Sequence, residues 1–171
     1  RFTYVAADKL TFEDMKINNP DPTLSRLTSK GRLGTVDAFI NHSWSDAPQG
    51  KWDALQARRT KFKWEHGNRE PKLWIDKYSM DQKPIENSLA CLPVYLSACS
   101  KLVVMCGETY LSRLWCLVEI FVYLEMGGKL SNLEVHLLET PGDSSGKKSI
   151  ADMIMKFDAR NARCFTQEDT N

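Results

Sequence analysis

The stretch Leu102-Val103-Val104-Met105-Cys106 decides the fold class of this chain. Its residues are all apolar, and an uninterrupted apolar run of this length predicts a strand that is buried on both faces. Such strands are typical of parallel sheets with helices on each side. Helical patterns flank the run: residues 85–99 precede it, and residues 111–126 follow it and end at Gly127-Gly128, a common sequence just past a helix.

Further strands and helices alternate along the rest of the chain. This alternation predicts the α/β class, as a flavodoxin-like three-layer sandwich whose parallel sheet has about five strands joined by right-handed crossovers. Residues 76–84 are expected to form a long loop. The remaining strands are expected at 36–40, 72–75, 133–138 and 163–165, and the remaining helices at 50–65 and 149–157.

Residues 1–34 show no strong period, although residues 10–17 can form a short helix. We interpret residues 1–34 as an N-terminal extension packed on the domain or as a linker, and residues 35–171 as the domain. Ligands of open α/β sheets bind at the carboxyl ends of the strands. Function is therefore expected at the edge where three loops gather: 42–50, 76–84 and 106–112.

Composition excludes several classes of function. The chain has 23 Lys and Arg residues against 22 Asp and Glu, and this balance argues against nucleic acid or an acidic membrane surface as a partner. No apolar run approaches the ~20 residues of a membrane span, and the start has no signal-peptide pattern, so we expect a cytoplasmic protein without a membrane span. The five cysteines lack paired spacing, which argues against disulfides and against a metal site.

The helix expected at 111–126 carries an unusual polar stripe. At 100° per residue, one side of it holds Ser112, Cys116, Glu119 and Tyr123. The opposite side is apolar and is expected to meet the sheet; it holds Leu114, Leu117, Val118 and Phe121. A single carboxylate among aromatic and thiol groups at the ligand edge is a candidate functional group. Alternatively, the aromatic side chains bury against a neighbour and Glu119 lies at the rim.

Three segments resemble TIR (Toll/interleukin-1 receptor-like) domains. Asp37 to Asp46 reads Asp-Ala-Phe-Ile-Asn-His-Ser-Trp-Ser-Asp and resembles the first strand and the following loop of the family. Leu73-Trp74-Ile75-Asp76 resembles the second strand, which leads into the so-called BB loop. Tyr110 to Ile120 resembles the pattern of Tyr, Ser, Trp-Cys and then Glu on the third helix. The matches follow the family's order and cover roughly residues 35–165.

The chain also departs from the family pattern. Arg113 and Leu114 stand between the serine and the tryptophan, where the family has one residue, and residues 81–84 lack the glycine frequent in the BB loop. Trp74-Ile75-Asp76 also resembles the fungal HET domain. The chain is therefore similar both to TIR domains and to HET domains, as a divergent branch between these two families would be. Residues 166–169 resemble only the start of the family's last helix, which is expected to be missing here.

The resemblance implies one of two functions. TIR enzymes act in signalling or defence and cleave NAD⁺ into nicotinamide and ADP-ribose or a cyclic isomer, whereas TIR adaptors only self-associate. The enzymes need the carboxylate that Glu119 matches, and this gives Glu119 the catalytic role. Because the departing nicotinamide of NAD⁺ is already cationic, the carboxylate has to stabilise the positive charge that develops on the ribose. NAD⁺ is then the substrate, and no cofactor is implied.

The position of the loops and the resemblance together give a set of candidate substrate-binding residues: Trp44, Ser43, His42, Trp115, Cys116 and Asp76. Trp44 offers a plane for a ring of the dinucleotide or serves as a core or lid aromatic. Ser43 and His42 can contact phosphate or ribose, or can cap their loop. Cys116 resembles the TIR cysteine linked to cyclising activity, with a packing thiol as the alternative. Asp76 can also orient the loop after it.

Two further expectations concern the loops and the first helix of the domain. The resemblance implies that loop 76–84 takes part in self-association, through Tyr78, Met80 and Lys83; the alternative is that these side chains fold back onto their own domain. Asp46 is expected to be the N-cap of the helix at 50–65. The basic residues of that helix, beginning with Lys51, are expected to form a solvated face or to meet an acidic partner.

Overall fold

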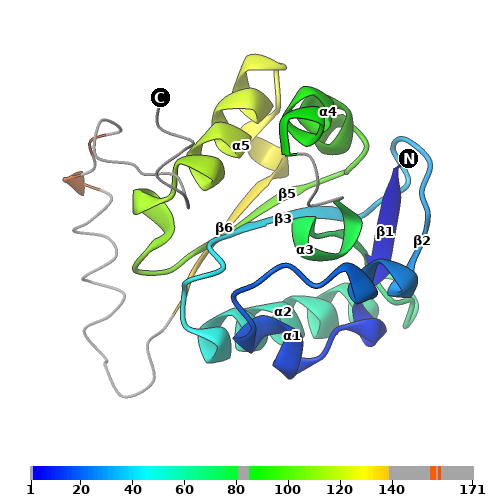
Figure 1. Ribbon diagram of the computed structural model, residues 1–171. Coiled ribbons are helices and arrows are strands. Elements are labelled where there is room, and N and C mark those ends of the chain that lie inside the picture. Colours follow the sequence, from blue (N-terminus) through cyan, green and yellow to red (C-terminus); the bar gives the residue numbers. More distant parts are fainter. Residues whose placement is uncertain (1, 81–84, 139–154, 157, 159–171) are drawn as a thin grey trace.

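The computed structural model describes residues 2–80, 85–138, 155–156 and 158. Its centre is one six-stranded sheet with the order β2-β1-β4-β3-β5-β6 (Figure 1). The strands are β1 Thr3–Ala6, β2 Thr28–Lys30, β3 Ala38–His42, β4 Lys72–Trp74, β5 Leu102–Cys106 and β6 Leu133–Leu137.

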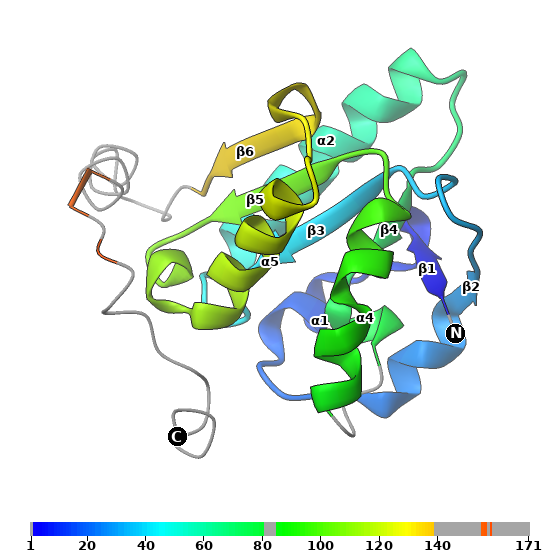
Figure 2. The ribbon, with the colours of Figure 1, turned by 90° about the horizontal axis from the view of Figure 1, so that it is seen from above.

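Helices cover both faces of the sheet, as the apolar run at β5 predicts. Figure 1 shows α1 and α2 below the sheet and α4 and α5 above it, and Figure 2 shows α4 and α5 side by side across the strands. The helices are α1 Phe12–Lys16, α2 Pro48–Glu65, α3 Asp76–Ser79, α4 Ile85–Ser97 and α5 Leu114–Glu125, with short 3-10 turns at η1 Ala7–Lys9, η2 Pro22–Leu27, η3 Tyr110–Ser112 and η4 Leu130–Asn132.

The sheet is mixed, which corrects the expected all-parallel sheet. Strands β4, β3, β5 and β6 pair in parallel, but β1 pairs antiparallel with β4 and with β2. Both β1 and β2 come from the segment 1–34, which showed no strand pattern because each strand is only 4 or 3 residues long. The strand predicted at 163–165 and the helix predicted at 149–157 lie outside the described residues, apart from residues 155–156.

The central strands divide their side chains between two cores, because successive residues of a strand point to opposite faces. On β5, Val103 and Met105 pack in the core between the sheet and helices α1 and α2. Leu102, Val104 and Cys106 pack in the core beneath α4 and α5. Every residue of β3 and β5 is buried, so the strands that lead to the predicted site are fixed from both sides.

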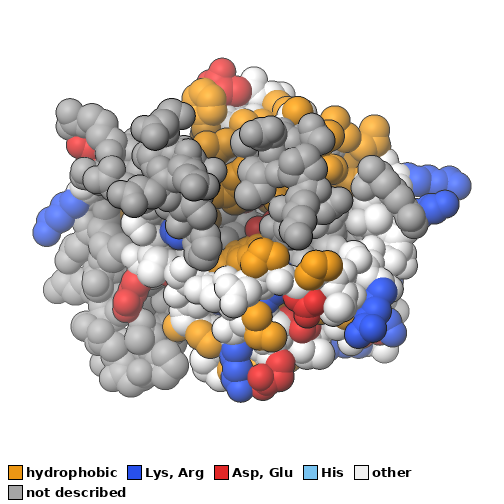
Figure 3. Space-filling view, viewed as in Figure 1, with side chains coloured by type: hydrophobic (Ala, Val, Ile, Leu, Met, Phe, Trp, Pro, Cys, Tyr) orange, Lys and Arg blue, Asp and Glu red, His pale blue; other side chains and the backbone are white. Residues whose placement is uncertain are grey.

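The orientation of α5 is the reverse of the predicted one. Its buried residues are Cys116 and Glu119, whereas Phe121, predicted to meet the sheet, is 62% exposed. The helix is apolar on nearly all sides, so its period could not identify the buried face. The stripe with Glu119 therefore faces the sheet, and hydrophobic side chains gather on the outer surface over α4 and α5 (Figure 3).

Two remaining findings concern residues 76–84 and the lengths of the helices. The predicted loop 76–84 begins as the short helix α3, and its residues 81–84 lie outside the described residues. Within the part of the chain that the structure describes, no helix is long and apolar enough to cross a membrane.

Candidate functional site

The carboxyl ends of three parallel strands and the start of α5 meet at one edge of the sheet. Asn41 lies near the end of β3, Asp76 begins α3 two residues after the end of β4, and Tyr110 lies in η3 after β5. Asn41 Nδ2 donates a hydrogen bond of 2.8 Å to the carbonyl oxygen of Cys116, which ties β3 to α5. This arrangement brings Glu119 of α5 to the edge where the sequence placed the site.

Glu119 is a carboxyl group in a low-dielectric surrounding. It is 3% exposed, and burial raises its pKa well above the usual value; the negative charge of Asp76 raises the pKa further. The indole N–H of Trp115 lies near enough to oppose this rise, although it makes no hydrogen bond of good geometry. Among the described residues no salt bridge involves Glu119, so none of them gives its ionised form a counter-ion.

His42, Trp44 and Asp76 come together beside Glu119. Trp44 Nε1 donates to Asp76 Oδ2 at 2.9 Å, and the backbone N–H of Lys77 donates to Asp76 Oδ1 at 2.7 Å. His42 Nε2 lies 3.6 Å from Asp76 Oδ1, and the Lys77 ammonium lies 5.7 Å from the centre of a Trp44 ring. Asp76 therefore orients both Trp44 and the first turn of α3, in line with the role of orienting its own loop.

Ser43 and Asp46 clamp the loop after β3 to the loop after β5. The buried Ser43 hydroxyl lies 2.7 Å from Thr109 Oγ1. The buried Asp46 carboxylate accepts hydrogen bonds from the N–H groups of Gly107, at 3.1 Å, and Thr109, at 2.7 Å. The N-cap of α2 is Ala47, without a side-chain cap, so the predicted N-cap role of Asp46 is wrong. A Cβ atom at Gly107 would lie 2.4 Å from Asp46 Cγ, and this close approach requires glycine.

Lys51 is a site residue that sequence reasoning missed. The sequence predicts that it belongs to a basic face that is solvated or meets an acidic partner, but it is 1% exposed. Its ammonium donates to the carbonyl oxygens of Ser43, at 3.2 Å, and Trp44, at 2.9 Å. Burial lowers its pKa to about 8, although the charges of Asp46 and Asp76 oppose the change. A cation in the first turn of a helix opposes the helix dipole, and that was the signal available in the sequence.

Buried polar atoms without a partner are concentrated around Glu119. In the described residues most such side-chain atoms belong to this edge: Asn41 Oδ1, His42 Nε2, Tyr110 OH and Trp115 Nε1. Buried polar atoms are nearly always paired in folded proteins, so each of these atoms calls for an explanation. Together they offer an amide acceptor, an indole donor, a hydroxyl and an imidazole nitrogen, which suits a polar ligand with several hydroxyl groups.

Cys116 packs as a core thiol. It belongs to the core beneath α4 and α5, and burial raises its pKa well above the usual value, with a further rise from the charge of Glu119. The neutral thiol is a poor nucleophile. This location favours the packing interpretation of Cys116 over a chemical one.

The three predicted self-association residues do not form one exposed surface. Tyr78 is buried in the core between the sheet and helices α1 and α2, and its hydroxyl donates to the Asp14 carboxylate. Burial raises the pKa of Tyr78, and so does this hydrogen bond. Met80 is partly buried against the opposite core, and Lys83 lies outside the described residues. Tyr78 therefore has no surface to offer to a partner.

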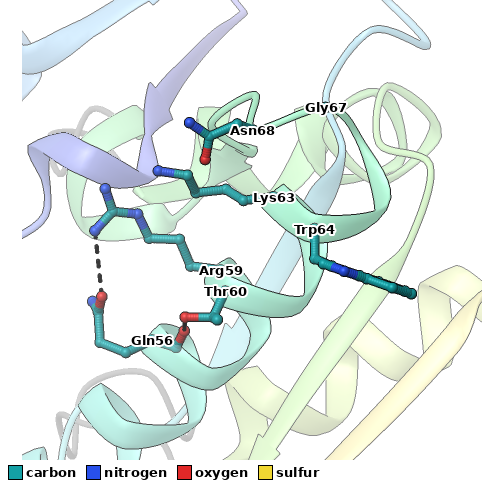
Figure 4. A pocket seen from close by; sticks show the side chains of 7 residues that line it. All are labelled: Gln56, Arg59, Thr60, Lys63, Trp64, Gly67 and Asn68. Carbon is teal, nitrogen blue, oxygen red and sulfur yellow. Dashed lines mark hydrogen bonds between the residues drawn. The ribbon is translucent and has the colours of Figure 1, made fainter.

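A surface hollow lies away from this edge, along the second half of α2 (Figure 4). Its cations are already paired: Arg59 and Lys63 both bind Glu70, at 2.7 and 2.8 Å. Trp64 points away from these two side chains in Figure 4. The hollow contains none of the predicted site residues; it is lined by Gln56, Arg59, Thr60, Lys63, Trp64, Gly67 and Asn68.

Two further findings concern metal ions and known proteins. Among the described residues, no group of His, Cys, Asp or Glu side chains is placed to hold a metal ion. Comparisons with protein-family models, with curated proteins and with solved structures found no match. A functional assignment therefore depends on the geometry around Glu119 and on the motifs of the sequence.

Proposed function

We propose that the chain is a TIR-like NAD⁺ glycohydrolase with Glu119 as its catalytic carboxylate. The strand order supports this proposal. The parallel strands lie in the order β4-β3-β5-β6, which by appearance in the chain corresponds to 2-1-3-4, the start of the flavodoxin-like order. The site residues lie at the carboxyl ends of these strands, where ligands of such sheets bind.

The burial of Glu119, for which the described part of the chain provides no counter-ion, carries the proposal. An ionised carboxylate in this position is strongly stabilised by any cation that enters, because the low dielectric strengthens their attraction. In NAD⁺ the bond between nicotinamide and ribose breaks with its electron pair leaving on nicotinamide, and positive charge develops on the ribose. Glu119 can stabilise that charge until water attacks the ribose carbon and releases a proton, which gives ADP-ribose.

The raised pKa of Glu119 fits this role. Burial shifts the equilibrium of Glu119 toward the neutral carboxyl group, because it raises the pKa. The cationic nicotinamide ribosyl group favours the ionised form, so substrate binding promotes loss of the proton. The rate of NAD⁺ cleavage is therefore expected to rise with pH as Glu119 ionises.

Access to Glu119 requires movement, because the side chain is 3% exposed. We propose that self-association triggers this movement. With Tyr78 buried, the contact must use other residues, and Met80 and Lys83 remain the predicted candidates. A cytoplasmic location belongs to this proposal, because NAD⁺ is abundant there.

An assembly-only adaptor is the second candidate, and the outer face of α5 favours it. Phe121 and Leu124 are exposed on this helix, and exposed apolar side chains that gather on one face are typical of an interaction surface. An adaptor requires no cleavage chemistry, so the two candidates differ in one measurable activity.

The test is to incubate purified protein with NAD⁺ over a wide range of protein concentrations and to measure free nicotinamide by chromatography, with light scattering alongside. We expect nicotinamide release whose rate per molecule rises as assemblies form. A constant rate per molecule across a range that holds only monomer would contradict control by assembly. No release at any concentration would reject the enzyme and leave the adaptor.

A further inference from the structure

Tyr110 is held rigidly at the site. It lies in η3, between β5 and α5, and is 1% exposed. The turn fixes its backbone, because the Tyr110 N–H donates to the Gly107 carbonyl at 3.3 Å and the Arg113 N–H donates to the Tyr110 carbonyl at 3.1 Å. The ring belongs to the core beneath α4 and α5. Its hydroxyl therefore occupies a defined position beside the start of α5.

The Tyr110 hydroxyl has no hydrogen-bond partner among the described residues. A buried hydroxyl without a partner destabilises a fold, and phenylalanine would fill the same space without that penalty. The nearby negative charges of Cys116 and Glu119 add to the effect of burial in raising the pKa of Tyr110. The hydroxyl thus stays protonated and remains able both to donate and to accept a hydrogen bond.

The surroundings of this hydroxyl define the ligand that would satisfy it. Asn41 Oδ1 is also buried without a partner. The amide orientation is fixed, because Asn41 Nδ2 donates to the Cys116 carbonyl at 2.8 Å. Glu119 contributes a carboxylate acceptor. A sugar hydroxyl both donates and accepts, so a pair of hydroxyls on one ring could pair with the phenol, which donates and accepts, and with these two acceptors.

We infer that Tyr110, together with Asn41, binds the hydroxyls of the ribose next to nicotinamide, and that Tyr110 makes the site prefer ribose to deoxyribose. This inference rests on the proposed function. The alternative is that the Tyr110 hydroxyl is an unpaired group with no role, like Ser79 Oγ, which is also buried without a partner but lies in α3. Ser79 therefore provides a matched control.

The experiment compares Tyr110→Phe with Ser79→Ala, since each removes one unpartnered hydroxyl. Substrates are NAD⁺ and its 2′-deoxy and 3′-deoxy analogues on the nicotinamide ribose. Tyr110→Phe is expected to keep or gain thermal stability and to raise KM for NAD⁺ roughly 3- to 10-fold, the effect of one hydrogen bond. Its preference for NAD⁺ over one deoxy analogue should fall by the same factor. Ser79→Ala should match the wild type in all these properties.

Several results would overturn the inference. If Tyr110→Phe keeps the wild-type KM and the wild-type preference while the wild type releases nicotinamide, the inference fails and the proposed function stands. A marked loss of stability in Tyr110→Phe would show a structural partner and also overturn it. If the wild type releases no nicotinamide, the proposed function fails; calorimetry with ADP-ribose then decides the inference, and equal Kd values for wild type and Tyr110→Phe overturn it.

Discussion

Replacing Lys51 by methionine tests the buried cluster quantitatively. Lys51 is 1% exposed, and burial lowers its pKa from 10.5 to about 8. That difference of about 2.5 pH units, at about 1.4 kcal/mol per unit, corresponds to about 3 kcal/mol of free energy that opposes the charged form in the folded state. The penalty is present in full below about pH 8.

The sign of the pH dependence follows from proton binding. Between about pH 8 and pH 10.5 the unfolded chain keeps its proton on Lys51 and the folded chain loses it. The unfolded state then binds more protons, so the free energy of unfolding that Lys51 contributes rises with pH across this interval, by about 3 kcal/mol in total. Lys51→Met lacks this rise.

Methionine also removes a contribution that does not change with pH. The Ser43 and Trp44 carbonyls lose the donor that Lys51 provides, at a cost of about 1 kcal/mol each. We therefore expect Lys51→Met to be close to the wild type in stability at pH 7, and less stable than the wild type by about 2–3 kcal/mol at pH 10.5.

The assay is urea unfolding of both proteins at several pH values between these limits. Lys61→Met is the matched control, because Lys61 lies on the same helix with its side chain 75% exposed; its difference from the wild type should not change with pH. If the free energies of unfolding of Lys51→Met and of the wild type change in parallel with pH between pH 7 and pH 10.5, the reasoning about Lys51 is refuted.

Three further predictions concern other contacts. Because burial raises the pKa of Glu119, the folded state loses stability as pH rises above the unfolded value; Glu119→Gln should be more stable than the wild type at neutral pH, and lower stability would contradict this. Gly107→Ala should cost about 1–3 kcal/mol of stability through its clash with Asp46, and an unchanged melting temperature would argue against the clamp. The double variant Tyr78→Ala, Met80→Ala should lose about 3–5 kcal/mol of stability, whereas normal melting with weaker assembly in light scattering would restore Tyr78 to the interface.

Much of the fold could be predicted because local patterns decide it. The apolar run at β5 and the helical period of α4 each identify one element without knowledge of its neighbours. Strands β1 and β2 could not be predicted, because they are short and are stabilised by antiparallel pairing with residues far along the chain. Pairing of that kind leaves little trace in local sequence.

The sequence indicates where the candidate site lies, but it does not indicate most of the contacts there. The edge and Glu119 follow from the alternation of elements and from the TIR resemblance. The inward face of α5 could not be identified, because Phe121 and its apolar neighbours resemble a core face. Burial of Lys51 and the clamp made by Asp46 depend on hydrogen bonds between a side chain and the backbone of a loop, and no sequence period encodes such contacts.

Nicotinamide release by Glu119→Gln and by the wild type, at equal protein concentration and equal degree of assembly, tests the central claim most directly. We predict that the wild type cleaves NAD⁺ and that Glu119→Gln, folded and at least as stable, is slower by about 100- to 1,000-fold, the usual effect of losing a charge-stabilising group. A Glu119→Gln variant that cleaves NAD⁺ at the wild-type rate, or a wild type that releases no nicotinamide even when assembled, would contradict the claim.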